Sequence, residues 1–171
     1  NMAKTGAYIA ANPSTQASAM WSRSTPAPAS YANTPYFGLH TFYYQSSGAT
    51  QPLKFRWDLA PTLGHVGLTQ EQATSFAPDF LEGKLQQQVN DKTNKVSFVL
   101  TATIGHKEDT NIDPSQTWPD DREKVVMGSI TIDSVGGTAC VNTNFDPNIL
   151  SAGFTPSADP VLRMRSPAYG I

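Results

Sequence analysis

The chain has 171 residues, of which 39% are hydrophobic and 15% are charged, and its formal net charge is −2 at neutral pH. This length predicts one domain with a hydrophobic core, and the weak net charge provides no basic surface for nucleic acid. The single cysteine, Cys140, excludes an internal disulfide, and no cysteine and histidine cluster has the spacing of a structural zinc site.

The apolar stretches of the chain are short and interrupted by polar residues. Segment 96–104, for example, contains serine and threonine and is far too short to span a bilayer. We therefore predict a soluble protein with neither a membrane nor a nucleic acid as partner. The first residues show no basic segment followed by an apolar core, so no signal peptide is visible and the compartment stays open.

The first thirty residues predict a helical lead-in and an extended connector. Asn12-Pro13-Ser14 divides residues 3–23 into two helical pieces, and Ser14 is the predicted cap of the second. Residues 25–30 contain two prolines, which suit neither a helix nor a central strand. We therefore predict a lead-in over 1–30 and a separate unit over 31–171.

A β-hairpin is predicted after this connector. The aromatic run 37–44 reads as one strand, Ser46-Ser47-Gly48 as a turn, and 53–59 as a second strand in which apolar and charged residues alternate. Alternation predicts that one face of the second strand is buried and the other is wet. The buried face would hold Leu53, Phe55, Trp57 and Leu59, and the wet face Lys54, Arg56 and Asp58.

Helical pieces follow the hairpin. Thr69 and Gln72 have the spacing of a capping box, in which each side chain accepts a hydrogen bond from the backbone of the other residue. The helical pattern then continues to about Gln88, with an interruption near Pro78.

Two further strands are predicted over 96–104 and 125–132, because both runs are rich in β-branched residues. The polar segment 105–123 between them is predicted to be a long loop that is functional or packs across a neighbour, with Trp118 as a core or interface aromatic. Four strands leave two free sheet edges, so the sheet is expected to need a partner.

A spaced pattern of ten residues occupies the C-terminal part of the chain. It consists of Phe145, Asp146, Pro147, Leu150, Gly153, Ser157, Asp159, Leu162, Arg165 and Tyr169. The pattern resembles the approach of haem catalases to the proximal side of their haem. Gly38-Leu39-His40-Thr41-Phe42 resembles the G-x-H-T-F strand of that family, and 113–119 resembles its D-P/T-x-x-W-P loop. Short loops and Arg-Ser-Pro-Ala-Tyr over 165–169 resemble the smaller catalase-related peroxidases in particular.

The resemblance implies an α+β fold that is mainly antiparallel β. The chain would form the second half, about four strands, of a catalase-type eight-stranded antiparallel β-barrel with helical insertions, and 145–171 would be the haem-proximal segment. It would then belong to a haem b peroxidase or catalase that acts on hydrogen peroxide, or on organic peroxides with a small reductant. A homo-oligomer is expected.

The spacing of Arg165 and Tyr169 has a physical reason. A phenol with its reference pKa of ~10 is a poor iron ligand at working pH. Four residues along a helix bring the Arg165 guanidinium beside the Tyr169 oxygen, where it favours the phenolate and lowers its pKa. The resemblance implies that Tyr169 is the axial iron ligand and Arg165 its partner.

Three more residues receive roles from the resemblance. Phe145 and Val161 would be apolar contacts to the porphyrin. His40 matches a family histidine that faces the haem cavity, although its spacing fits a satisfied core histidine equally well. By contrast, His65 and His106 lie in polar loops and are predicted to be solvated, and no role is assigned to them. The adjacent carboxylates at 120–121 predict a wetted charge cluster rather than a calcium site.

Catalases also use a distal histidine and a distal asparagine to move the peroxide proton. The resemblance places both upstream of Asn1, so we expect the activity to need the N-terminal half of the catalase core, in cis or from a cleaved chain. A family helix with a propionate-binding arginine would follow Tyr169. We favour a fragment of a larger protein; one chain of a nicked protein and a degenerate domain without haem are the other interpretations.

Two other functions stay open from the sequence. A non-enzymatic or inactive barrel fragment would bind an apolar ligand or a partner protein through the hairpin 37–59. A tyrosine-ligated haem barrel would instead isomerise fatty-acid hydroperoxides, and the distal residues distinguish this reaction from peroxide reduction.

Overall fold

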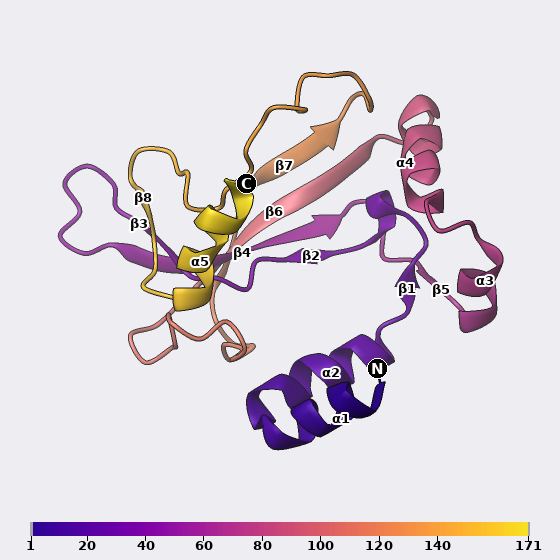
Figure 1. Ribbon diagram of the computed structural model, residues 1–171. Coiled ribbons are helices and arrows are strands. Elements are labelled where there is room, and N and C mark those ends of the chain that lie inside the picture. Colours follow the sequence, from indigo (N-terminus) through magenta and orange to yellow (C-terminus); the bar gives the residue numbers. More distant parts are fainter. Residues whose placement is uncertain (1, 171) are drawn as a thin grey trace.

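A computed structural model describes residues 2–170 and shows an open antiparallel sheet with helices over its two ends (Figure 1). The strand order is β7-β6-β4-β3-β8, and β2 also pairs with β4. The strands are β2 (Tyr36–Phe37), β3 (Phe42–Tyr44), β4 (Leu53–Pro61), β6 (Val96–Ile104), β7 (Lys124–Ile132) and β8 (Phe154–Pro156). The predicted α+β class is confirmed, and within residues 2–170 the sheet does not close into a barrel.

The remaining elements flank this sheet. A small two-stranded sheet joins β1 (Ala27–Pro28) to β5 (Gly67–Leu68). The helices are α1 (Met2–Ala11), α2 (Gln16–Ser24), α3 (Gln70–Ser75), α4 (Phe80–Asn90) and α5 (Pro160–Tyr169). Across the described part of the chain, no helix has the length and apolar character needed to cross a membrane.

The N-terminal lead-in is a helical hairpin of α1 and α2 that lies apart from the sheet in Figure 1. The predicted break between two helical pieces is confirmed, but the predicted Ser14 cap is wrong. Proline at position 13 begins a 3-10 turn, Pro13–Thr15, which takes Ser14 into its interior. Thr15 is the N-cap of α2, and its side chain makes no capping hydrogen bond.

The capping box before α3 is confirmed. Thr69 Oγ1 accepts a hydrogen bond from the Gln72 backbone N–H at 3.2 Å, and Gln72 Oε1 accepts one from the Thr69 N–H at 2.9 Å. The chain is extended at Phe76, before Pro78, so the predicted interruption is also confirmed. The helix α4 then continues to Asn90, slightly beyond the predicted end.

The hydrophobic core lies on one face of the sheet and is divided into two clusters. At one end, Leu162 of α5 packs with Phe42, Phe55 and Ala102. At the other end, the buried residues Ala32, Val96 and Phe98 contact apolar residues of α4 and β4, including Leu59, Leu85 and Val89. A groove of 420 Å³ between the clusters is lined by Tyr36, Trp57, Leu59 and Leu100, among others. The middle of this face is therefore open.

The predicted continuous strand 37–44 is wrong, because a bulge divides it into β2 and β3. Phe37 pairs with Asp58 and Phe42 pairs with Phe55, so residues 38–41 face only residues 56 and 57 of β4. The extra residues loop out of the ladder, as in a β-bulge. This places His40 outside the regular strand register.

Gly38 is required where this bulge begins. Its backbone N–H donates to the Trp57 carbonyl oxygen at 2.7 Å. A Cβ at position 38 would lie 2.6 Å from the same oxygen, which is a severe steric clash. Only glycine permits this close backbone approach.

The predicted wet face of β4 is also wrong. The loop 105–123 packs across it and places the buried Trp118 ring against two cations of that face. The Arg56 Cζ lies 4.5 Å and the Lys54 Nζ 5.7 Å from the Trp118 ring centroid. An aromatic face attracts cations, which explains why these charged side chains are partly covered and not fully solvated. The prediction of Trp118 as a core residue is confirmed.

We expect Gly38→Ala to lower the free energy of unfolding by about 1–3 kcal/mol, because the new Cβ overlaps the Trp57 carbonyl and forces the bulge to shift. Urea denaturation followed by circular dichroism measures this change. Gly83→Ala is the matched control, since a Cβ at position 83 in α4 meets no atom within 4 Å. Equal stability of the Gly38→Ala variant and the parent would contradict the role assigned to this glycine.

Candidate functional site

The helix α5 is fixed at its N-terminus by the buried residue Asp159. One carboxylate oxygen, Oδ1, accepts hydrogen bonds from the backbone N–H groups of Val161 at 2.8 Å and Leu162 at 3.3 Å. Aspartate is a favoured N-cap, and Pro160 suits the first helical turn. Because Leu162 is also fully buried against the sheet, the start of α5 is held by both polar and apolar contacts.

Arg165 and Tyr169 meet one turn apart near the other end of α5. The Arg165 guanidinium donates a hydrogen bond to the Tyr169 hydroxyl oxygen at 2.5 Å. Its Cζ lies 5.2 Å from the Tyr169 ring centroid. The tyrosine is 40% exposed, so its oxygen has a permanent cation on one side and stays accessible on another.

The segment 145–149 is fastened along α5 by Asn148. Its side-chain amide donates to the Leu162 carbonyl at 2.9 Å and to the Ser166 hydroxyl at 2.8 Å. Asp146 accepts from the Asn148 backbone N–H at 2.8 Å, and this hydrogen bond holds the pKa of the Asp146 carboxyl below its ordinary value. The turn at Asp146 thus presents Asn148 to the helix, a role that the sequence pattern did not identify.

Phe145 and Val161 are apolar residues of this region that remain in solvent. Phe145 is 65% exposed and Val161 is 51% exposed. Val161, Arg165 and Tyr169 follow one another at four-residue intervals, so they lie along one side of α5. This side of α5 thus presents an exposed apolar residue and, two turns further on, a phenol with a cationic partner, which is chemistry that suits a flat apolar cofactor carrying a metal.

His40 is placed at the start of α5 and not beside Tyr169. Its Nδ1 lies 2.7 Å from Asp159 Oδ2, and the His40 side chain is only 12% exposed. The same carboxylate therefore contacts the helix backbone through one oxygen and the imidazole through the other. The structure brings Arg165 and Tyr169 together, with Val161 on the same helix, and connects His40 to them through Asp159 and the helix.

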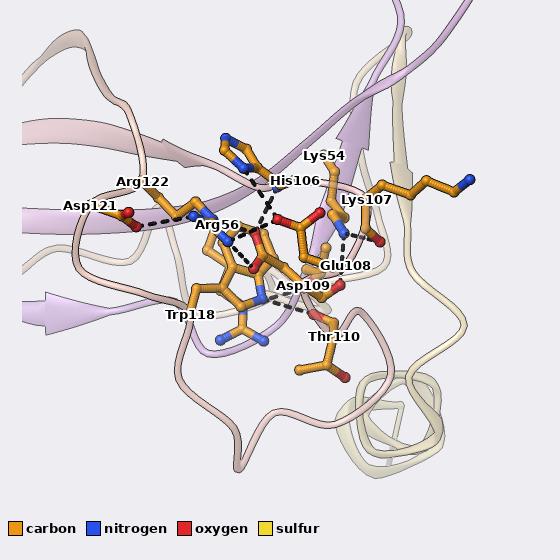
Figure 2. Close-up of polar contacts among 11 residues, drawn as sticks. Lys54, Arg56, His106, Lys107, Glu108, Asp109, Thr110, Trp118, Asp121 and Arg122 are labelled. Atoms are coloured by element: carbon orange, nitrogen blue, oxygen red, sulfur yellow. Dashed lines mark hydrogen bonds and ion pairs between the residues drawn. The ribbon is translucent and has the colours of Figure 1, made fainter.

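A second polar network holds the loop 105–123 against Lys54 and Arg56 of β4 (Figure 2). Arg122 donates two parallel hydrogen bonds to the Asp109 carboxylate, at 2.8 and 2.9 Å. The His106 backbone N–H donates to the same carboxylate at 2.6 Å. These bonds, first of all those from Arg122, lower the pKa of Asp109 to about 2.

Trp118 is fixed within this loop. Its indole N–H donates to the Thr110 carbonyl at 2.8 Å, and Lys54 Nζ donates to the Asp109 carbonyl at 2.7 Å. The wetted charge cluster predicted nearby holds for Asp121, which is 80% exposed, but Arg122 beside it is only 9% exposed. The sequence did not reveal the pairing of Arg122 with Asp109, because a run of charged residues looks the same whether or not one of them is buried.

The Asp109 pKa predicts an acid-dependent contribution to stability. Because the folded pKa is depressed, the contribution is fully present above pH ~4 and is lost as the pH falls toward ~2. We expect the stability difference between the parent and Asp109→Asn to shrink over that range, as measured by urea unfolding at successive pH values. Asp121→Asn, at an exposed partner of the same arginine, should show a small difference at every pH. A pH-independent Asp109→Asn difference would contradict this expectation.

The comparisons with known proteins establish the family. The catalase family model matches residues 2–170, so this chain belongs to the catalase family, whose members are haem enzymes of peroxide chemistry. Within that family, the chain is 36% identical over 171 residues to a catalase-related peroxidase of Synechococcus elongatus. It is 34% identical over 148 residues to a catalase-related peroxidase of Mycolicibacterium paratuberculosis. The resemblance drawn from the sequence motifs is confirmed.

These relatives are longer than this chain. The match covers 98% of the chain but 50% of the Synechococcus protein, and 83% of the chain but 45% of the Mycolicibacterium protein. The chain therefore spans about half the length of these relatives.

Solved structures show the same fold. Catalase A from Saccharomyces cerevisiae superimposes with a TM-score of 0.72 at 20% identity, over 84% of this chain and 32% of that one. A fungal catalase superimposes with a TM-score of 0.74 at 22% identity, over 83% of this chain and 30% of that one. The open sheet described above is therefore a part of the catalase fold.

Proposed function

We propose that this chain forms the proximal side of a haem b peroxidase or catalase that acts on hydrogen peroxide or on organic peroxides with a small reductant. In this proposal Tyr169 would hold the haem iron through its oxygen, and Arg165 would be its partner. The observation that carries the proposal is the hydrogen bond from Arg165 to the Tyr169 oxygen. Membership of the catalase family and the similarity to two catalase-related peroxidases support it.

Arg165 would keep the tyrosine oxygen in the form that binds iron. A guanidinium remains charged throughout the working pH range, and a hydrogen bond to the phenolate favours that form over the neutral phenol. Ferric haem, when bound, supplies the redox chemistry of peroxide cleavage, and an anionic oxygen ligand favours the ferric state.

The other residues have supporting roles in this proposal. Phe145 and Val161 would cover the porphyrin face and exclude water, because both are apolar and exposed. Asp159, with His40, would fix the start of α5 and hence the position of the ligand along the helix. The proposal assigns the transfer of the peroxide proton to the N-terminal half of the catalase core.

That upstream half is also the partner that the exposed sheet needs. β7 is an edge strand with exposed apolar side chains at Val126, Met127 and Ile130. An unpaired edge offers backbone donors and acceptors to a further strand. The open groove lined by residues of β2, β4 and β6 offers apolar surface to other parts of the upstream half. We infer that strands of the upstream half pair with β7 and pack into this groove.

Reconstitution with hemin tests the proposed ligand. We expect the chain, combined with the first half of the Synechococcus relative, to give a Soret band that shifts and loses intensity in Tyr169→Phe, because the phenolate oxygen is removed. Tyr8→Phe is the control, since Tyr8 is an exposed tyrosine of the separate helix α1. Identical spectra for Tyr169→Phe and the parent would exclude Tyr169 as the ligand.

Association with the same upstream half tests the proposed partner. We expect Val126→Lys and Ile130→Lys together to weaken association at least about tenfold in analytical ultracentrifugation, because charges on an edge strand oppose strand addition. Val141→Lys is the matched control, because Val141 is an exposed valine outside the sheet. Equal loss of binding in the control, or no loss in the edge variant, would place the interface elsewhere.

A further inference from the structure

Arg56 is one of the two β4 residues that lie opposite the bulge 38–41. The ladder on either side of the bulge brings residues 38–41 opposite residues 56 and 57. Arg56 and Trp57 point to opposite faces of the sheet, because side chains alternate along a strand. His40 contacts Asp159 at the start of α5, which packs on the Phe55 face, while the Arg56 side chain contacts the loop 105–123 on the other face.

The Arg56 guanidinium connects that loop to the bulge. Its Nε donates to the Thr41 hydroxyl at 3.3 Å, and its Nη1 donates to the Gln116 carbonyl at 2.9 Å. The flat group also lies on the Trp118 ring, with a Cζ to centroid distance of 4.5 Å. One side chain therefore contacts the bulge, the loop backbone and the loop tryptophan.

Thr41 continues this connection to α5. The Thr41 side chain is fully buried, and its backbone carbonyl accepts a hydrogen bond from the Ser157 N–H at 3.1 Å. The Ser157 hydroxyl in turn accepts from the Asp159 N–H at 3.4 Å. His40, the residue before Thr41, contacts the Asp159 carboxylate directly. Two adjacent bulge residues thus hold the cap of α5.

We propose that Arg56 is a positioning residue: by fixing Thr41 from behind the sheet, it holds the bulge in the shape that directs His40 at Asp159 and keeps α5 in place. The loop 105–123 fixes the Arg56 rotamer and so supports the site from the far face. This inference deepens the proposed function and rests on it, because α5 carries the proposed ligand.

The chemistry of the contacts requires an arginine. A planar guanidinium can stack on an indole while its N–H groups donate in the plane to two separate acceptors. A lysine ammonium is a compact charge and cannot make all three contacts at once. Lys54 gives a natural comparison, because its Nζ also lies over Trp118 but donates to loop carbonyls and not to Thr41.

Amide hydrogen exchange on the full 171-residue chain tests the proposal without haem. We expect Arg56→Lys to speed exchange of the Val161 and Leu162 amides, which Asp159 caps, by about tenfold, as for the loss of one hydrogen bond. The His40 ring nitrogen resonances should change as well, while amides in the β6 and β7 ladder keep their protection. Arg23→Lys, the same change at an exposed arginine of α2, should leave both the cap amides and the His40 ring unchanged.

Thr41→Val provides a second route to the same contact. It removes the acceptor while keeping the branched shape, and we expect the same faster exchange at Val161 and Leu162. The double variant with Arg56→Lys should be no worse than either single variant, because both remove one interaction. Thr41→Ser keeps the hydroxyl acceptor, so its Val161 and Leu162 amides should exchange as in the parent. If Arg56→Lys folds poorly, the difference between Thr41→Val and Thr41→Ser still tests the contact.

The outcomes separate this inference from the proposed function. Additive effects of Arg56→Lys and Thr41→Val, or exchange at the cap equal to that of Arg23→Lys, would overturn the role of Arg56. A Soret band unaffected by Tyr169→Phe would overturn the proposed ligand and leave the exchange result standing. Faster exchange spread over the whole sheet would show that Arg56 serves only global stability and would also overturn the proposal.

Discussion

The arrangement of the candidate site depends on the buried carboxylate of Asp159. Its two oxygens have different partners: the first turn of α5 on one side and His40 on the other. A buried carboxylate is costly unless hydrogen bonds satisfy it, so these contacts fix the helix start and the imidazole together. Tyr169, the ligand candidate at the far end of α5, is positioned through the helix that this cap fixes.

The sheet joins this cap to the rest of the molecule. On one face, α5 packs on the core through Leu162; on the other, the loop 105–123 covers the charged residues of β4. The bulge that begins at Gly38 connects the two faces. His40 in the bulge contacts Asp159 at the start of α5, and Thr41 beside it accepts a hydrogen bond from Arg56 on the other face. The site therefore has support from both sides of a single layer.

Local features of the fold were predictable from the sequence. The capping box at Thr69 and the break near Pro78 depend on residues close together in the chain, and their chemistry is the same in most contexts. Two predictions were wrong: the continuous strand over 37–44 and the solvent-exposed face of β4. Both rested on the alternation of apolar and polar residues, which assumes a regular strand with nothing packed on its polar face. A bulge and a covering loop are decided by distant residues, here Trp57 and Trp118.

The sequence alone determined the family and the contact between Arg165 and Tyr169. Four residues on one helix fix that geometry locally, and ten spaced residues are a specific pattern. Only the tertiary structure decided that His40 pairs with Asp159, 119 residues away, and that Arg56 serves the bulge rather than the solvent. Pairings at such separation depend on how the strands and helices pack, and no spacing along the chain encodes them.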